Sequence, residues 1–316
     1  MPVSPQDKTL VLCCLLSLLS DHTGGIADPG VAGMVYAITA FRKGIDVGAA
    51  VSAAVAIRGF LNMHNTVIAS NVTILDDGIR LRGVLERPSN ENSPLVIVLH
   101  GFTSTKDKSH TVSACHTMHD AGFATLRFDL YGHGESDGEF KHHTLYKWIS
   151  NTFAVINYAR ELDFVTDIFL SGHSQGGLVA ALAGGMAPDL IKGLILRAPA
   201  FMIPRCAREG TMLGRGFDPT HIPDEVEVIK GLTLAGDYIR VAQTIDVDAA
   251  IDRFPGSVLL IHGDADDVVP VEDTYAASRR YSHCALAVIP GETHHFDQFP
   301  DEMNASIRKW LMRTRA

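Results

Sequence analysis

Short apolar runs alternate with amphipathic segments from about residue 66 onward. Two β-like runs, VIASNVTIL and IRLRGVLER, flank residues 76–78, where an Asp-Gly pair between such runs signals a hairpin. The run LVIVLH at 95–100 is apolar throughout, which is typical of a buried parallel strand. Residues 144–162 predict a long helix, because apolar side chains recur there at spacings of three and four.

The same alternation continues to the C-terminus. Further strands are predicted at 123–129, 167–172, 193–198, 258–263 and 286–290. Further helices are predicted at 108–120, from Gln175, at 271–281 and at the C-terminal end. Repeated alternation of this kind is typical of a mostly parallel, twisted sheet with helices on both faces, so the sequence predicts an α/β fold.

Residues 199–250 interrupt this alternation. They are rich in proline and glycine and contain the helical pattern DYIRVAQTI. A stretch of about fifty residues between two core strands is too long for an ordinary loop. We therefore expect an inserted cap over the edge of the sheet at which ligands bind.

The first 62 residues predict a short helical extension of unknown role, ahead of a main domain at 63–316. The apolar run at 10–19 is shorter than the 18 or so residues of a membrane span, and it has the length of a signal-peptide core. The positive charge before it is weak, and a cleavage site is arguable only at Ala27. We therefore favour a short apolar helix, a cytoplasmic location and no stable membrane insertion. An alternative is that Met63 is the true start.

Composition and charge exclude some classes of protein. Hydrophobic residues make up 46% and charged residues 20%, which excludes a largely disordered chain. The net charge of -9 argues against a nucleic-acid partner, since such binders carry a basic footprint. An odd number of cysteines argues against a disulfide framework and favours a reducing compartment. The five are Cys13, Cys14, Cys115, Cys206 and Cys284.

The histidines do not form a recognisable metal motif. There are 15, among which His116 and His119 are three residues apart and His142 and His143 are adjacent. A zinc site needs three or four ligands with a supporting shell. We expect neither a metal nor an organic cofactor, while the sequence leaves open both a monomer and a homo-oligomer.

The pentapeptide GHSQG at 172–176 is a G-x-S-x-G motif. It follows the apolar strand DIFLS and opens the helical segment QGGLVAALAGG, the strand–turn–helix setting that a nucleophilic serine requires. A turn this sharp needs small neighbours, which Gly172, Gly176 and Gly177 supply. The pattern predicts Ser174 as a nucleophile; the alternative is a packing turn in which the serine caps a helix.

A serine nucleophile needs a base, and the base needs an orienting acid. HGDADDVVP ends one predicted strand and contains three aspartates, and PGETHHF follows the next strand with His294 and His295. Both segments lie at the carboxyl ends of strands, where the sites of open α/β sheets form. The three aspartates are Asp264, Asp266 and Asp267.

These motifs together resemble the α/β-hydrolase family. The family signature HGxxDxxVP implies that Asp266 is the acid, and the pattern G-x-x-H implies that His294 is the base, with His295 as the alternative. The resemblance also implies two backbone N–H groups that stabilise an oxyanion, those of Phe102 in HGF and of Gln175 after the nucleophile.

From about Asn71 onward the chain resembles bacterial cinnamoyl (feruloyl) esterases. The resemblance rests on HGFT, RFDLYGHGESDGEF, GHSQGG, PDLIKGLIL and the cap motif FDPTHIPDE...LTLAGDYIRVAQ. It implies a cap that holds an aromatic acyl group, with Tyr238 near a phenolic hydroxyl. Cys206 and Leu213 stand near positions where tight binders have acidic and amide side chains, which argues against strong phenol recognition. Alternatively, Tyr238 packs the cap onto the sheet.

The implied function is that of a serine carboxylesterase. It would hydrolyse small-molecule esters of hydroxycinnamic or short acyl acids through an acyl-enzyme intermediate. A lipase, thioesterase or peptidase of the same fold is an alternative, because the residues do not specify the substrate. A non-catalytic ligand-binding protein is the alternative from another class, and the presence of candidates for every catalytic role argues against it.

A truncated chain that begins at Met63 should fold and keep its kcat, because every candidate catalytic residue lies after residue 95. Circular dichroism and ester hydrolysis, measured beside the full chain, test this. An insoluble or inactive truncated chain would show that residues 1–62 are a structural part of the protein.

Overall fold

The computed structural model describes residues 67–88, 92–229 and 231–314. The predicted extension at 1–62 and the alternative start at Met63 lie outside the described residues. The core strands are β1 (Ile68–Asp76), β2 (Ile79–Arg87), β3 (Ser93–Leu99), β4 (Ala124–Phe128), β5 (Val165–His173), β6 (Gly193–Arg197), β11 (Ser257–Gly263) and β12 (Cys284–Ile289). The core helices are α4 (Ser109–Asp120), α5 (Leu145–Arg160), α6 (Gln175–Met186), α9 (Val247–Arg253), α10 (Val271–Arg280) and α11 (Pro300–Thr314), with a 3-10 turn η1 (Phe140–His142).

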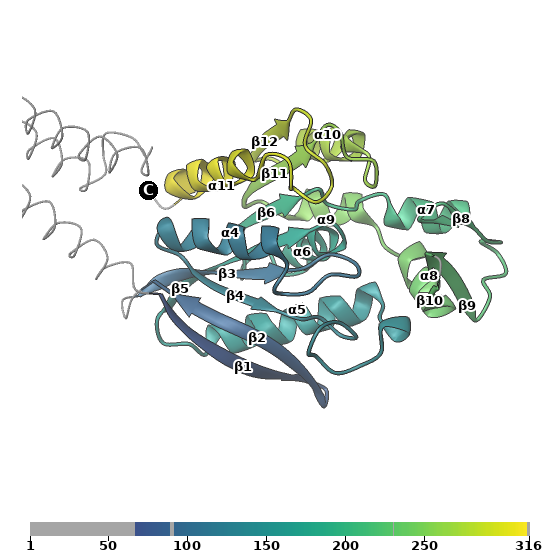
Figure 1. Cartoon of the computed structure of the whole chain (residues 1–316), viewed down its shortest axis with the longest axis horizontal. Coiled ribbons are helices and arrows are strands. Elements are labelled where there is room, and N and C mark those ends of the chain that lie inside the picture. The colour runs from purple at the N-terminus through teal and green to yellow at the C-terminus, as the bar shows by residue number, and fades with distance from the viewer. Residues whose placement is uncertain (1–66, 89–91, 230, 315–316) are drawn as a thin grey trace, which may run out of the picture. The chain divides into compact units, whose positions relative to one another are not determined.

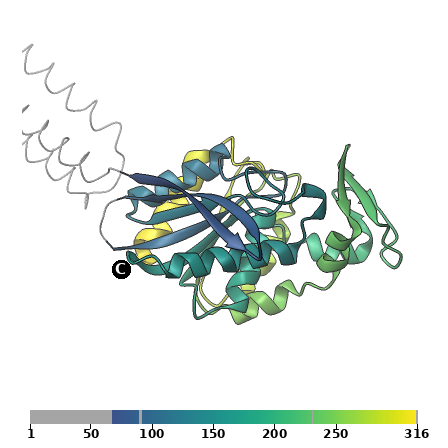
Figure 2. The same cartoon turned by 90° about the horizontal axis from the view of Figure 1, so that it is seen from below.

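Eight strands form one sheet in the order β1-β2-β4-β3-β5-β6-β11-β12. The pairs from β4 to β12 are parallel, and β2 joins β4 and β1 in antiparallel register. Figures 1 and 2 show this twisted sheet with helices on both faces. The predicted fold class is therefore confirmed, and every predicted core strand and helix is present.

The chain reverses its direction across the sheet at β3. It runs from β3 to the neighbour on one side, β4, and then crosses back to β5 on the other side. The loops that leave β3 and β5 therefore diverge at their carboxyl ends, which is where open α/β sheets bind ligands. These are the loops that contain Phe102 and Ser174.

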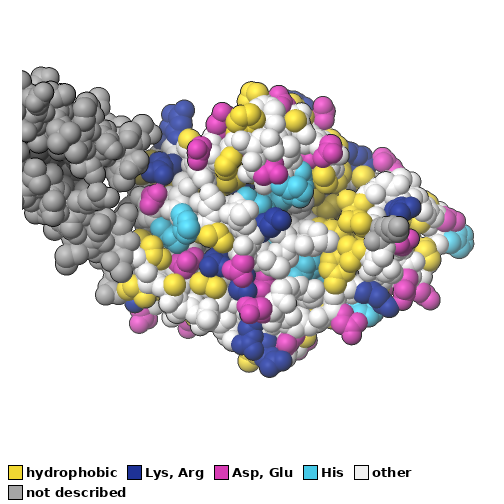
Figure 3. All heavy atoms as spheres, in the orientation of Figure 1, with side chains coloured by type: hydrophobic (Ala, Val, Ile, Leu, Met, Phe, Trp, Pro, Cys, Tyr) yellow, Lys and Arg dark blue, Asp and Glu magenta, His cyan; other side chains and the backbone are white. Residues whose placement is uncertain are grey.

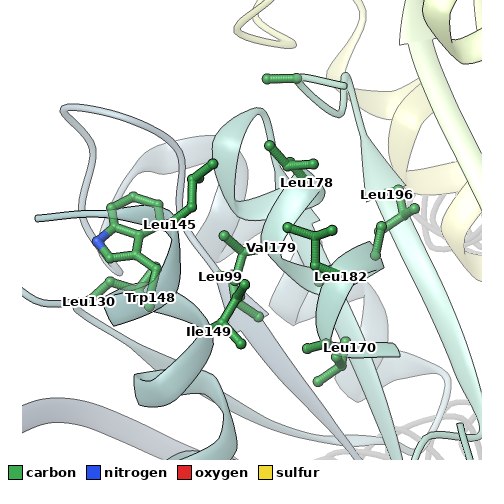
Figure 4. Packing of buried hydrophobic residues seen from close by; sticks show 14 of the residues in the cluster. Leu99, Leu130, Leu145, Trp148, Ile149, Leu170, Leu178, Val179, Leu182 and Leu196 are labelled. Carbon is green, nitrogen blue, oxygen red and sulfur yellow. The ribbon is translucent and has the colours of Figure 1, made fainter. Parts of the chain in front are cut away.

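The buried strands divide their side chains between two hydrophobic layers. Along β3, Leu95, Ile97 and Leu99 face the layer beneath α5 and α6, while Val96 and Val98 face the layer beneath α4 and α11. This alternation follows from the two-residue period of a strand, and an apolar residue at every position satisfies both faces. Figure 4 shows the layer of α5 and α6, in which Trp148 and Ile149 of α5 lie beside leucines of α6 and the sheet.

Local sequence accounts for two of the boundaries. Asp77 and Gly78 both have positive φ, 48° and 81°, as the tight turn between β1 and β2 requires. The side chain of Thr144 accepts a hydrogen bond from the backbone N–H of Lys147 at 3.2 Å and so caps the start of α5.

The segment between β6 and β11, where we expected a cap, carries its own small elements. They are α7 (Ile203–Glu209), β7 (Thr211–Met212), β8 (Arg215–Gly216), β9 (Glu225–Ile229), β10 (Leu232–Ala235) and α8 (Gly236–Gln243). The strands form two antiparallel hairpins that lie beyond the carboxyl ends of the core strands (Figures 1 and 2). The sequence interpretation did not include the hairpins. The two-residue strands β7 and β8 leave too few positions for alternation, whereas the alternating EVEVI of β9 was a signal that the interpretation missed.

Within the described part of the chain, no helix combines the length and the apolar character that a membrane span needs.

Candidate active site

Ser174 occupies a strained turn between β5 and α6. Its backbone has φ 55° and ψ −122°, a conformation that costs a non-glycine residue about 1–3 kcal/mol. Backbone hydrogen bonds from a neighbouring segment hold it: the Ser174 N–H donates to the Arg197 carbonyl at 2.9 Å, and the Ala200 N–H donates to the Ser174 carbonyl at 3.0 Å. The strained turn is therefore supported by the end of β6 and the residues that follow it.

The glycines around the turn are required by close backbone contacts. A Cβ at Gly172 would lie 2.2 Å from the carbonyl oxygen of Gly176, and a Cβ at Gly176 would lie 2.3 Å from that of His100. Backbone atoms at these distances cannot move aside as a flexible side chain can. Gly172 and Gly176 thus allow the end of β5, the start of α6 and the end of β3 to meet at Ser174.

Ser174, His294 and Asp266 form a continuous hydrogen-bond chain. His294 Nε2 lies 3.0 Å from Ser174 Oγ, and His294 Nδ1 lies 2.7 Å from Asp266 Oδ2. The carboxylate only accepts, so the Nδ1–H of His294 donates to it. Nε2 of the neutral ring then carries the lone pair that faces the serine hydroxyl. All three side chains are nearly buried, and that of Asp266 has no exposed surface.

The carboxylate of Asp266 is held on both oxygens. Oδ1 accepts from the backbone N–H groups of Val268 at 2.9 Å and Val269 at 2.8 Å, and Oδ2 also accepts from His262 Nε2 at 3.1 Å. Burial favours a raised pKa, but the hydrogen bonds from His262, His294 and Val269 outweigh it and hold the pKa of Asp266 well below its ordinary value. The acid is therefore ionised and fixed before any substrate arrives.

His262 is a contributor to this site that the sequence interpretation treated only as part of a motif. Its Nε2–H points to both Asp266 and the carbonyl oxygen of Val269, and its Nδ1 accepts from the Thr274 hydroxyl at 2.6 Å. It is completely buried. Its position as the histidine of the HGxxD pattern was the sequence signal that could have revealed this role.

The other candidates in these two loops lie apart from Ser174. His295 is exposed, next to His294 in sequence but turned away, with the two ring centroids 5.4 Å apart. Asp264 accepts from the backbone N–H of Gly291 at 2.6 Å, and Asp267 is exposed. The structure thus brings together Ser174, Asp266 and His294.

The two predicted oxyanion donors flank Ser174. Within residues 67–88, 92–229 and 231–314, neither the Phe102 N–H nor the Gln175 N–H has a hydrogen-bond acceptor. Gln175 is the first residue of α6, where N–H groups lack an intrahelical partner and the helix dipole favours negative charge. Gly101, before Phe102, lies so close that a Cβ there would be 3.2 Å from the Cβ of Ser174. Both N–H groups are therefore free to bind an oxyanion.

A buried ion pair, which the sequence interpretation missed, fixes the loop of Phe102. Asp129, completely buried, accepts from the backbone N–H of Lys106 at 2.7 Å and from its ammonium at 3.0 Å, and also from the Glu135 N–H at 3.0 Å. Burial favours a lowered pKa, but hydrogen bonds to Glu135, Asp129 and Asp107 raise the pKa of Lys106. The sequence signal for this ion pair was Asp129 itself, an acidic residue directly after an apolar strand, in the segment RFD.

Tyr238 of α8 connects the insertion to the turn of Ser174. Its hydroxyl donates to Gln175 Oε1 at 2.7 Å, and its side chain is 1% exposed. Its ring lies 5.1 Å from that of His143 and 6.5 Å from that of Phe102. Burial raises the pKa of Tyr238. This geometry favours the packing interpretation, because the hydroxyl proton is already donated within the protein.

Cys206 and Leu213, the other candidate substrate contacts, lie elsewhere in the insertion. Cys206 is half-buried on α7, and Leu213 is 40% exposed at the turn between β7 and β8. Figure 3 shows hydrophobic side chains gathered between the core and the insertion. No group of three His, Cys, Asp or Glu side chains in the described ranges is placed to hold a metal ion.

Sequence comparison gives partial matches to known proteins. A family model described as serine aminopeptidase, S33, matches residues 90–223, which include Ser174 but neither Asp266 nor His294. The human protein ABHD12B is 26% identical over 191 residues, 59% of this chain and 49% of that protein. Caffeoylshikimate esterase of Arabidopsis thaliana is 35% identical over 114 residues, 34% of each chain. The chain thus spans half or less of the length of these curated relatives.

Solved structures match over more of the chain. Est1E from Butyrivibrio proteoclasticus with ferulic acid bound is 46% identical, with a TM-score of 0.76 over 77% of this chain and 99% of Est1E. A monoacylglycerol lipase from Paleococcus ferrophilus is 21% identical, with a TM-score of 0.56 over 74% of this chain and 99% of the lipase, and shares the fold.

The two adjacent histidines should respond differently to substitution. His294→Ala should lower the hydrolysis of p-nitrophenyl esters by several orders of magnitude, while His295→Ala should stay within about tenfold of the parent, because only one imidazole reaches Ser174. Steady-state rates of the two purified variants show which of the two histidines is the base. Equal losses, or the reverse order, would contradict the geometry.

Proposed function

Because the chain belongs to the α/β-hydrolase family, with esterases and lipases among its relatives, we propose that it is a serine carboxylesterase. The observation that carries this proposal is the hydrogen-bond chain from Asp266 through His294 to Ser174. It ends beside two backbone N–H groups without acceptors, those of Phe102 and Gln175. The proposed nucleophile and oxyanion donors thus lie side by side, with the base against the nucleophile and the acid behind the base.

Acylation follows from these positions. Ser174 Oγ attacks the ester carbonyl carbon as its proton passes to His294 Nε2, 3.0 Å away. The ionised Asp266 keeps the ring in the required tautomer and stabilises the imidazolium. The carbonyl oxygen becomes an oxyanion between the two N–H groups, and preorganised donors of this kind stabilise the transition state by about 3–4 kcal/mol each. His294 then protonates the departing alcohol.

Deacylation uses the same groups with water as the nucleophile. His294 takes a proton from water, which attacks the acyl carbonyl carbon, and the second oxyanion occupies the same pair of N–H groups. Ser174 leaves and recovers its proton from His294. Every proton moves between groups of this chain, the substrate and water.

For the acyl group, we propose an aromatic acid of the hydroxycinnamic type. The support is the similarity to Est1E, whose structure holds ferulic acid, together with the aromatic rings beside the turn of Ser174. Those rings are Phe102, Phe140, His143 and Tyr238, whose neighbouring centroids lie 4.9–6.5 Å apart. The partly exposed rings of Phe102 and Phe140 can stack on a planar cinnamoyl group, while the buried rings of His143 and Tyr238 pack against them. Short acyl esters would bind the same surface with less contact.

Ser174→Ala should abolish ester turnover without unfolding the protein, because loss of the nucleophile costs about a million-fold in rate in a well-studied serine protease. A fluorophosphonate probe should label the parent at Ser174 and leave the variant unlabelled. Aminoacyl p-nitroanilides serve as the comparison for peptidase activity. Residual ester hydrolysis above about a tenth of the parent, or preferred cleavage of the anilides, would refute the carboxylesterase assignment.

Tyr238→Phe distinguishes phenol recognition from packing. The structure predicts that kcat/KM for methyl ferulate and for p-nitrophenyl acetate falls together by about three- to tenfold, since one hydrogen bond of about 1 kcal/mol to Gln175 is lost. The acetate ester, which carries no phenol, is the control. A loss confined to ferulate would show instead that the Tyr238 hydroxyl recognises the substrate phenol.

A further inference from the structure

We propose that Glu292 is the positioning residue that holds the acid and the base of the site at their working distance. This inference rests on the proposed function, since it assigns a role in preparing His294 for reaction. Glu292 touches neither Ser174 nor His294 by its side chain, so it would act entirely through the two loops that it joins.

The carboxylate of Glu292 organises the loop that carries His294. It has no exposed surface, and both its oxygens accept backbone N–H groups of this loop. Oε1 accepts from Thr293 at 2.8 Å and from Gln298 at 3.2 Å, and Oε2 accepts from Phe299 at 2.7 Å. One side chain therefore fixes both ends of the segment 293–299, and His294 lies between them.

The surroundings of this carboxylate supply N–H groups in place of a cation. Within the described ranges Glu292 forms no ion pair. Phe299 directly precedes α11, so the carboxylate sits at the helix end where N–H groups lack partners and negative charge is stabilised. Hydrogen bonds to a charged acceptor are shorter and stronger than neutral ones. The loop is thus anchored to the first turn of a core helix.

The backbone of Glu292 reaches the loop that carries the acid. Its carbonyl oxygen accepts from the Ala265 N–H at 3.1 Å, and Ala265 immediately precedes Asp266. The same oxygen would lie 2.0 Å from a Cβ at Gly263, so the two loops are in direct contact there. Glu292 is two residues from His294 and one hydrogen bond from the neighbour of Asp266. It therefore sets the separation across which His294 Nδ1 meets Asp266 Oδ2.

A second anchor acts on His294 independently of Glu292. The ring of His173 donates its Nε2–H to the His294 carbonyl at 2.8 Å, and burial lowers the pKa of His173 so that this ring stays neutral. With Glu292 changed, the middle of the loop would remain attached while its ends are released. We therefore expect a displaced imidazole in a folded protein.

The test compares Glu292→Gln with Asp297→Asn. Both change a carboxylate to an amide in the same loop, but Asp297 is exposed, and its carboxylate accepts from the side chains of Thr293 and Gln298. Gln at 292 turns one acceptor into an NH₂ group that faces a backbone N–H. In E292Q, kcat and the rate of fluorophosphonate labelling should fall by about a hundredfold with KM within about threefold, since a displacement of ~1 Å costs this much. D297N should stay within about twofold of the parent.

A spectroscopic signature separates positioning from general loss of stability. The proton between His294 Nδ1 and Asp266 should give a downfield NMR resonance in the parent and in D297N, and it should be lost or shifted in E292Q. Glu292→Asp keeps the carboxylate but shortens the side chain by one methylene, so it should also lower the rate of fluorophosphonate labelling. This variant replaces E292Q in the test if E292Q does not fold.

Parent-like labelling and an unchanged resonance in either folded Glu292 variant would overturn the inference. Failure of both variants to fold would also overturn it, because Glu292 would then be a residue of the fold alone. Absence of labelling in the parent is a different result, which refutes the proposed function and leaves the contacts of Glu292 unaddressed.

Discussion

The close backbone contact at the end of β5 is the constraint on which the site depends. Gly172 and Gly176 let three chain segments meet where any Cβ would collide with a carbonyl oxygen. The strained conformation of Ser174 exists only within that contact, and it turns the hydroxyl toward His294. The same turn leaves the first N–H of α6 without an acceptor, so the proposed nucleophile and the proposed oxyanion donor share one geometric cause.

The remaining groups are brought to Ser174 by buried polar anchors in three separate loops. Asp129 binds Lys106 and so holds the loop of Phe102. Asp266 is held by two backbone N–H groups and His262, and the loop of His294 closes on Glu292. A buried carboxylate is costly unless its oxygens are satisfied, so each one fixes its surroundings tightly. The apolar layers on both sides of the sheet supply stability, whereas these carboxylates supply position.

A buried side-chain hydrogen bond links α8 of the insertion to the same site. Tyr238 contacts Gln175, the residue whose backbone N–H is the proposed oxyanion donor, so the cap and that donor are not independent. A displacement of α8 would therefore reach the residue next to Ser174.

The sequence by itself determined the core sheet, its helices and the elbow at Ser174. Strand alternation, helical spacing and glycine requirements are local properties, so they can be read from neighbouring residues. The choice of Asp266 and His294 came from resemblance, because spacing alone left three aspartates and two histidines open. Only the tertiary structure decided the bond from Tyr238 to Gln175, the ion pair of Asp129 with Lys106, and the burial of the Glu292 carboxylate. The first two join residues far apart in the sequence, and the hydrogen bonds of Glu292, although local, become strong through burial, which exists only once the chain has folded.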